Sequence, residues 1–176
     1  MAWRFALLKA SKDPNKIIYS DEMMSVIVDP YAKSEKHFLV VAKKDISSIS
    51  SAKKEDLEIL KAMDAKGREI AKAKGEGKQF KFGYHAEPSM ERLHLHVISD
   101  DFNSPALKNL KHWNSFNTSF FIDSEKAIKD LEKEGKVILP SKDEINEYLK
   151  TKLKCHKCEF VPKNMPKLKT HLLTHL

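Results

Sequence analysis

An alternating segment at residues 92–99, RLHLHVIS, constrains the fold of this chain more than any other stretch. In an extended strand, successive side chains point to opposite faces of the sheet. His94 and His96 would then share one face, while the opposite face is aliphatic. His85 lies just upstream, across a turn expected at residues 88–89. Three imidazoles in so short a stretch mark the candidate active site.

Periodicity in the rest of the first 149 residues predicts an α+β fold, in which an antiparallel sheet is covered by helices. β-branched and aromatic residues favour strands, and apolar residues at helical spacing after a capping residue favour helices. Ser50 and Ser51 are the candidate caps of the longest helix. Strands are expected at residues 25–29, 37–42, 79–85 and 92–99, and helices at 52–74, 125–134 and 142–150.

Length and composition favour one ordinary domain with a small appendage. Of the 176 residues, 41% are hydrophobic, which suffices for a core, and 32% are charged. No apolar run approaches the ~20 residues of a membrane span, and we expect no secretory leader. The only two cysteines are separated by two residues, so no disulfide framework is indicated and an intracellular location is expected.

Positive charge is concentrated at the C-terminal end of the chain. The net charge is +7, and residues 150–176 hold seven lysines against one acid, Glu159. The first 149 residues are nearly neutral, with 25 basic and 24 acidic residues. We therefore expect two domains, 1–149 and 150–176, of which the second is suited to nucleic acid. A basic tail that only improves solubility is the simpler alternative.

The same C-terminal segment has the spacing Cys-x2-Cys-x12-His-x3-His, which matches a Cys2His2 zinc finger of ββα or helical type. Leu168 occupies the place of the core leucine of a finger, whereas Pro162 stands where an aromatic residue is usual, with Phe160 as its candidate substitute. A chance coincidence of spacing is one alternative, and a redox-active cysteine pair is another, although no thioredoxin-like unit surrounds it. The expected ligands of a structural zinc ion are Cys155, Cys158, His171 and His175.

The histidines of the alternating segment suit phosphoryl or nucleotidyl transfer. A neutral imidazole can attack phosphorus, a second can donate to the phosphate oxygens, and a third can protonate a leaving group. Histidine performs these tasks near neutral pH because of its pKa. Alternating histidines can also decorate an exposed strand or bind a metal, and the residues themselves leave these alternatives open.

The segment HLHVI resembles the second part of the histidine triad (HIT) signature. GYHAEPSM, HLHVISDDF and KHWNSFNT together are similar to the aprataxin family, DNA-adenylate hydrolases that join a HIT domain to one C-terminal Cys2His2 finger. The resemblance covers nearly the whole chain, from Trp3 to His175. The forkhead-associated domain that precedes this unit in vertebrate members is not expected here.

The resemblance implies a role for each matching residue. His94 matches the nucleophile that takes AMP, and His96 matches the histidine that contacts the phosphate. His85 matches the group that protonates the departing DNA 5′-phosphate, and Ser89 matches a phosphate-binding serine. Nucleotide-binding matches are Leu7, Ile27 and Asp29, and phosphate-facing or DNA-facing matches are Lys33, His37, Lys108 and Lys111.

One position departs from the family pattern. The first triad residue is Arg92 instead of histidine, and arginine cannot act as a neutral acceptor. Because the implied roles fall on His94, His96 and His85, we expect activity to survive. A descendant that only binds its ligand is the alternative.

The combined interpretation is a hydrolase that removes AMP from 5′-adenylated DNA ends through a covalent AMP–histidine intermediate, in single-strand break repair in the nucleus. Zinc is expected to be structural, no catalytic metal is expected, and damaged DNA is the expected partner. The helix at 52–74 is a candidate wedge against a DNA end, or a plain core helix. The rival hypotheses are a general HIT hydrolase of small AMP conjugates and a DNA-binding module without catalysis.

Overall fold

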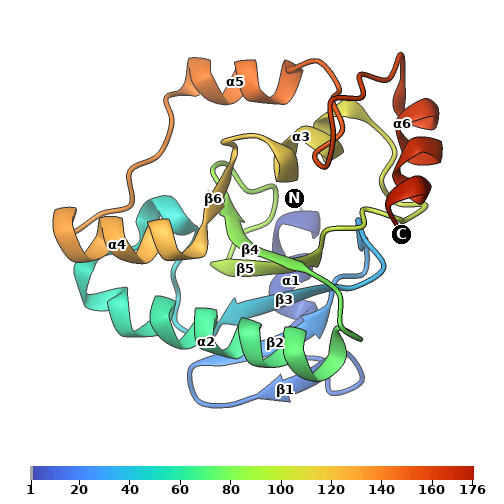
Figure 1. Ribbon diagram of the computed structural model, residues 1–176. Helices are drawn as coiled ribbons and strands as arrows, with labels where there is room; N and C mark the ends of the chain where they lie inside the picture. Colours follow the sequence, from blue (N-terminus) through green and yellow to red (C-terminus); the bar gives the residue numbers. More distant parts are fainter. Residues whose placement is uncertain (1) are drawn as a thin grey trace.

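The computed structural model describes residues 2–176 and contains one six-stranded antiparallel sheet (Figure 1). The strands follow the order β1-β2-β3-β5-β4-β6, so the strand with the histidines, β5, is central. Its neighbours are β3, which pairs Leu39 with His96, and β4, which pairs Gly83 with His96. The strands are β1 (Ile17–Ser20), β2 (Met24–Val28), β3 (His37–Ala42), β4 (Phe80–His85), β5 (His94–Ser99) and β6 (Phe121–Asp123).

One face of the sheet is covered by α2 (Leu57–Lys74) and, next to it, α4 (Ser124–Glu134). In the hydrophobic core on this side of the sheet, the aliphatic side chains of β5 pack against the apolar side chains of α2. Gly67 allows a close approach here, because a Cβ at this position would lie 2.9 Å from Val97 Cγ2. The contact explains why α2 is held flat against the centre of the sheet.

The opposite face carries the histidines and is flanked by α1 (Ala6–Ala10) and α3 (Leu110–Asn117). Leu7 and Ala10 of α1 pack on Ile27 of β2 and Leu39 of β3. On the other side, α3 packs against α5 (Lys142–Lys150) and β6. The histidines therefore lie in a hollow between two helical walls.

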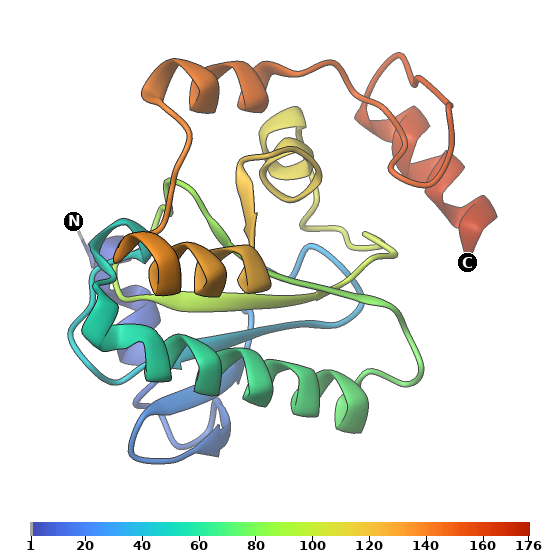
Figure 2. The ribbon, with the colours of Figure 1, turned by 60° about the vertical axis from the view of Figure 1, so that its left-hand side comes forward.

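The C-terminal segment folds around α6 (Met165–Leu172), which continues into the short 3-10 turn η4 (Leu173–His175). Asn164 caps α6, since its side chain accepts a hydrogen bond from the Lys167 N–H. No strand occurs between residues 151 and 164, so the finger is of the helical type. Figure 2 shows it beside α3, at the end of the molecule away from α2.

The expected α+β fold is confirmed, and several boundaries differ. The long helix begins at Leu57, after the 3-10 turns η2 (Ile49–Ser51) and η3 (Lys54–Asp56), so the expectation that Ser50 or Ser51 caps it is wrong. The elements that the sequence did not predict include α3 and β6, between residues 110 and 123. A short 3-10 turn η1 (Ala2–Phe5) precedes α1, and among residues 2–176 no helix has the length and apolar content needed to cross a membrane.

Candidate active site

His94 and His96 project from β5 onto the same face, with ring centroids 5.0 Å apart. The ring of His85, at the end of β4, lies 4.3 Å from that of His96. His37, at the start of β3, lies 5.2 Å from His96. The ring of Phe116 on α3 lies within 5.5 Å of His37, His85 and His96. Four imidazoles from three strands thus share one aromatic-walled hollow.

The hydrogen bonds of His94 fix its tautomer. Its Nδ1 lies 2.8 Å from the carbonyl oxygen of Arg92. A carbonyl oxygen only accepts, so Nδ1 must carry the proton and donate. Neutral His94 therefore keeps a free lone pair on Nε2, the atom that a nucleophilic imidazole needs.

A chain of hydrogen bonds assigns the opposite tautomer to His96. The backbone N–H of Lys33 donates to His37 Nδ1 at 3.1 Å, so neutral His37 carries its proton on Nε2. That Nε2 lies 2.9 Å from His96 Nδ1 and 3.5 Å from Asp29 Oδ2. His96 Nδ1 must accept, and its Nε2 then carries the proton, buried and without a partner among the described residues. His96 is a ready hydrogen-bond donor.

Burial keeps these imidazoles neutral. It lowers the pKa of His37 to about 4, with Lys33 acting in the same direction and Asp29 against it. It holds the pKa of His85 and His96 well below the usual value, and neighbouring imidazoles add to the effect. The pKa of His94 is also lowered by burial, while its bond to the Arg92 carbonyl and the charge of Asp29 oppose the shift. At neutral pH the cluster is uncharged.

The histidines open into a cleft of about 810 Å³. Asp29, Lys33, Ser89, Lys108 and Lys111 are among the residues that line it, and Lys111 belongs to α3. All catalytic residues that the sequence predicted, and all the predicted lysines, therefore meet in one depression.

Leu7 and Ile27 do not line the cleft. They are 2% and 1% exposed and belong to a buried cluster against which Met90 packs. Met90 does line the cleft. The two predicted pocket residues thus lie behind Met90, which is one of the apolar side chains that line the cleft.

His37, expected to face phosphate or DNA, lines the cleft although it is buried. Its side chain is only 1% exposed, and both ring nitrogens are engaged, with Lys33 N–H and with His96. The donor atoms of Asp29, His37 and His96 lie within 4.8 Å of one another, close enough to hold a metal ion. A metal there would displace the Nε2 proton that His37 donates to His96.

The sequence led us to expect a strand that includes Arg92, but Arg92 lies outside β5. The strand begins at His94, and Arg92 has a φ of 87°, in the left-handed region. Its guanidinium donates to the Lys43 carbonyl at 2.7 Å and lies 3.3 Å from Asp45. Arg92 therefore contributes its carbonyl to His94, while its guanidinium is engaged away from the strand.

Sequence reasoning missed His112 as a cleft residue. It lies in the first turn of α3, where its Nδ1 accepts from the Lys108 N–H at 3.1 Å, so its Nε2 carries the proton. The pKa of His112 is lowered by partial burial and by Lys33, Lys108 and Lys111. An isolated histidine that follows a lysine carries no periodic signal, and only the position of α3 brings it to the cleft.

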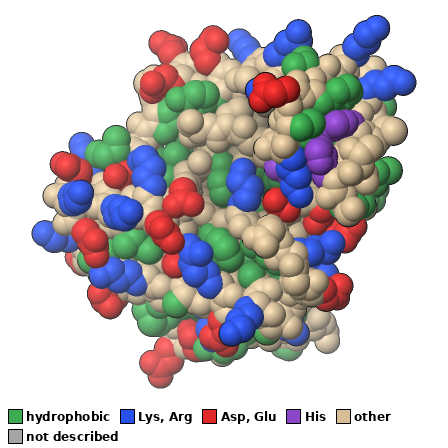
Figure 3. Space-filling view, in the orientation of Figure 1, with side chains coloured by type: hydrophobic (Ala, Val, Ile, Leu, Met, Phe, Trp, Pro, Cys, Tyr) green, Lys and Arg blue, Asp and Glu red, His purple; other side chains and the backbone are tan. Residues whose placement is uncertain are grey.

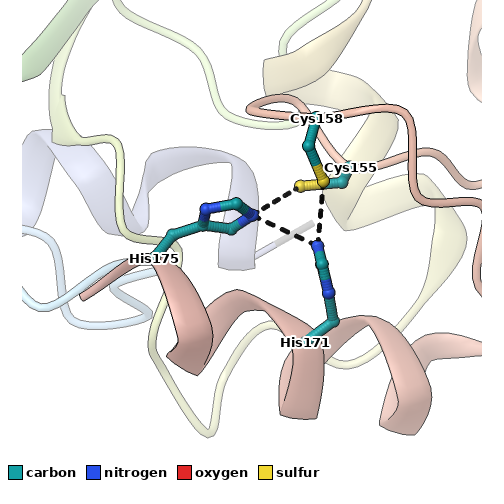
Figure 4. A group of neighbouring side chains, drawn as sticks. All are labelled: Cys155, Cys158, His171 and His175. Atoms are coloured by element: carbon teal, nitrogen blue, oxygen red, sulfur yellow. Dashed lines mark hydrogen bonds between the residues drawn. The ribbon is translucent and has the colours of Figure 1, made fainter.

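The four predicted finger ligands converge, as Figure 4 shows. Cys158 Sγ lies 3.1 Å from His171 Nε2, Cys155 Sγ lies 3.5 Å from His175 Nε2, and the two Nε2 atoms are 3.2 Å apart. Tetrahedral zinc with bonds of about 2.0–2.3 Å separates its ligand atoms by roughly 3.3–3.7 Å. The donor set and the spacing fit structural zinc. Phe160 stacks on His171 with centroids 4.1 Å apart, in the place of the missing aromatic.

The fold and the two clusters define a class of protein, a histidine-triad-like sheet joined to a zinc-binding finger. Residues 2–112 match the family described as "Scavenger mRNA decapping enzyme C-term binding", and residues 117–176 match the "C2HE / C2H2 / C2HC zinc-binding finger" family.

Comparison with individual proteins identifies the family within this class. The chain is 44% identical to the aprataxin of Gallus gallus over 98% of this chain and 55% of that protein. It is also 44% identical to the aprataxin-like protein of Drosophila melanogaster, over 100% of this chain and 27% of that protein. The chain belongs to the aprataxin family, and it spans between about a quarter and just over half of these relatives.

The fold is similar to the crystal structure of "aprataxin ortholog Hnt3 in complex with DNA". The TM-score is 0.74 at 23% identity, and the match covers 99% of this chain and 92% of the other. This likeness establishes the shared architecture of sheet and finger.

Proposed function

We propose that this protein hydrolyses the phosphoanhydride that links AMP to the 5′-phosphate of DNA, in two steps through an AMP–His94 intermediate. The observation that carries the proposal is the pair of fixed tautomers, which gives His94 a free Nε2 lone pair and His96 a free Nε2–H. Membership of the aprataxin family supports the adenylated substrate. Repair of abortive ligation products in the nucleus would be its setting.

In the first step, His94 Nε2 attacks the AMP phosphorus. An N–P bond forms, and the P–O bond to the DNA 5′-phosphate breaks. His85 donates its proton to the departing phosphate. The buried His85 is neutral in the free protein, and an anionic substrate beside it raises its pKa, so His85 takes up a proton from solvent on binding and is then the imidazolium that acts as the acid.

In the second step, water attacks the same phosphorus from the side that the DNA has left. The new O–P bond forms as the N–P bond breaks, so His94 recovers its lone pair and AMP is released. His85 takes the proton of the attacking water and returns to its initial state. Both steps therefore close once His85 has taken up one proton from solvent on substrate binding, and that proton returns to solvent after AMP leaves; no step requires a metal in the cleft.

Hydrogen-bond donors that line the cleft stabilise the negative charge of the phosphate oxygens during both steps. The Nε2–H of His96 donates to a non-bridging oxygen, and His37, backed by Asp29, keeps His96 in that tautomer. His37 is thus proposed as a positioning residue instead of a DNA contact. Ser89 and Lys33 line the cleft near the same phosphates. Such preorganised donors are usually the largest contribution to phosphoryl transfer.

Binding of the nucleotide and the DNA uses the remaining walls. Asp29 accepts from the ribose hydroxyls, and Met90 faces the adenine. Lys108 and Lys111 follow the DNA strand from the cleft towards residues 150–176, the proposed finger domain. Figure 3 shows basic side chains projecting from the upper right of the molecule, where α6 lies. The crystal structure of Hnt3 with DNA supports this choice of partner.

Replacement of His94 tests the proposal. His94→Gln retains polarity and similar volume but has no imidazole, so AMP release from 5′-adenylated nicked DNA should fall below detection. Binding of the same DNA should persist within about threefold, and the melting temperature should match the unmodified protein. Full turnover by His94→Gln would contradict the mechanism. Comparison with a small AMP amide then decides between DNA and small conjugates as the preferred substrate class.

A further inference from the structure

We infer that the zinc finger is a fixed wall of the catalytic unit, joined to the end of the histidine-bearing strand by His156 as a positioning residue. Its effect on catalysis rests on the proposed function, whereas its effect on structure does not. The consequence is that metal in the finger supports turnover even of a substrate too small to touch the finger.

His156 lies between the ligands Cys155 and Cys158 and faces away from the metal cluster. Its Nε2 donates to the carbonyl oxygen of Asp100 at 2.6 Å. Asp100 directly follows β5, and its carboxylate lies 3.3 Å from Lys157 Nζ. The cysteine knuckle is therefore anchored at the end of the strand that carries His94 and His96.

An aromatic path continues from His156 to the catalytic cluster. The ring of His156 meets Phe102 edge-on at 5.2 Å and Trp113 at 5.3 Å. Phe102 lies 6.1 Å from Phe116, and Phe116 in turn lies 4.7 Å from His85 and 5.3 Å from His96. Two layers of rings thus separate the zinc knuckle from the reacting groups.

The finger and α3 share one buried core. Cys155, Leu168 and Leu172 are buried together with Trp113 and Phe116. Close-packed interiors transmit displacement because few voids are available to absorb it. The position of α3, which forms one wall of the cleft, therefore depends on the position of the finger packed behind it.

Hydrogen bonds also join the finger to the sheet domain. Lys169 Nζ of α6 donates to the carbonyls of Ser104 and Leu107, at 2.9 and 3.0 Å. The amide of Asn114 donates to the carbonyls of Leu149 and Thr151, which lead into the finger. Lys169 is thereby engaged in docking, unlike the exposed Lys163 and Lys167.

Zinc makes this docking conditional on metal. A finger of this size folds only when its ligands are held by the ion. Without zinc, the Cys155–Cys158 knuckle no longer fixes His156, and Phe102 and Trp113 are no longer covered. Phe116 then gains freedom against His85 and His96. A misplacement of about 1 Å in a catalytic group costs roughly a hundredfold in rate.

The structural test uses Trp113 as a reporter. The chain has two tryptophans, so Trp3→Phe leaves Trp113 as the sole one. Trp113 is 2% exposed, and zinc removal by a chelator should shift its emission to longer wavelength and restore it on zinc addition. Unchanged emission, with zinc loss confirmed by metal analysis, would overturn the inference.

The catalytic test uses a small AMP amide in place of DNA. His156→Ala should lower kcat by roughly tenfold or more, with KM changed less, because positioning and not binding is impaired. His156→Gln keeps an amide donor for the Asp100 carbonyl and should restore part of the rate. Val161→Ala is the matched control at an exposed position of the finger and should leave this rate unchanged.

The outcomes separate the two proposals. Equal kcat for His156→Ala and the unmodified protein would overturn the inference while leaving the proposed function intact. An unmodified protein that releases no AMP from either adenylated DNA or the amide would overturn the proposed function. The Trp113 emission then decides the structural claim alone. If His156→Ala does not fold, chelation of the unmodified protein supplies the same comparison.

Discussion

The buried His37 should make the protein lose stability in mild acid. In the folded state burial lowers the pKa of His37 to about 4, whereas an unfolded histidine titrates near 6.5. The unfolded chain therefore binds a proton that the folded chain does not, throughout the window between these values. By linkage, the stabilisation is present above pH 6.5 and is lost as the pH falls towards about 4.

The magnitude follows from the two pKa values. The pKa of His37 is about 6.5 in the unfolded chain and about 4 in the folded protein. When the pH falls from 7 to 5, this difference lowers the free energy of unfolding by about 2 kcal/mol. His85 and His96, whose pKa values are also held well below the usual value, act in the same direction. The loss should therefore be large relative to the 5–15 kcal/mol typical of folded domains.

Urea denaturation at pH 7 and pH 5, in the same excess of zinc, measures the loss. In His37→Gln the difference between the two pH values should be smaller by about 2 kcal/mol, because glutamine does not titrate. Proton competition at the finger ligands affects both proteins equally and cancels. His112→Gln, at the half-exposed mouth of the cleft, is the control and should change the difference less. An unaltered difference in His37→Gln would refute the reasoning.

Two further predictions address packing and charge. Gly83→Ala should destabilise the sheet by about 1–3 kcal/mol in urea denaturation, because its Cβ would lie 2.5 Å from the Ile122 carbonyl oxygen; a neutral result would mean that β6 moves freely. Replacement of both Lys163 and Lys167 by alanine should weaken binding to unadenylated duplex DNA and reduce the slope of log K against log salt, by about 1 for each phosphate that is no longer neutralised. An unchanged slope would place the DNA elsewhere on the finger.

Local pattern predicted those parts of the site that local geometry determines. The spacing of Cys155, Cys158, His171 and His175 was sufficient to predict that they would meet, because a knuckle and one helical turn set their positions. Alternation in β5 likewise predicted that His94 and His96 share a face.

Features that depend on distant contacts escaped prediction. The role of His37 depends on the register between β3 and β5, which places Leu39 opposite His96. Arg92 leaves the strand because its N–H donates to the Ser47 carbonyl, a contact made with a distant loop. The helix α3 is only eight residues long, and its Trp113 and Phe116 are buried in a cluster that is completed by residues of the finger. In each case the contacting residues are far apart in the sequence, so a local pattern cannot reveal the contact.

The central claim is that AMP passes through His94, and the most direct measurement is the mass of the protein quenched during turnover. With 5′-adenylated nicked DNA in excess, rapid denaturation at alkaline pH preserves a phosphoramidate. The account predicts a protein heavier by one adenylyl group, with the modification on the peptide that contains His94, and no such species in His94→Gln. Steady AMP release with no adduct on His94, at a time resolution shorter than one turnover, would contradict it.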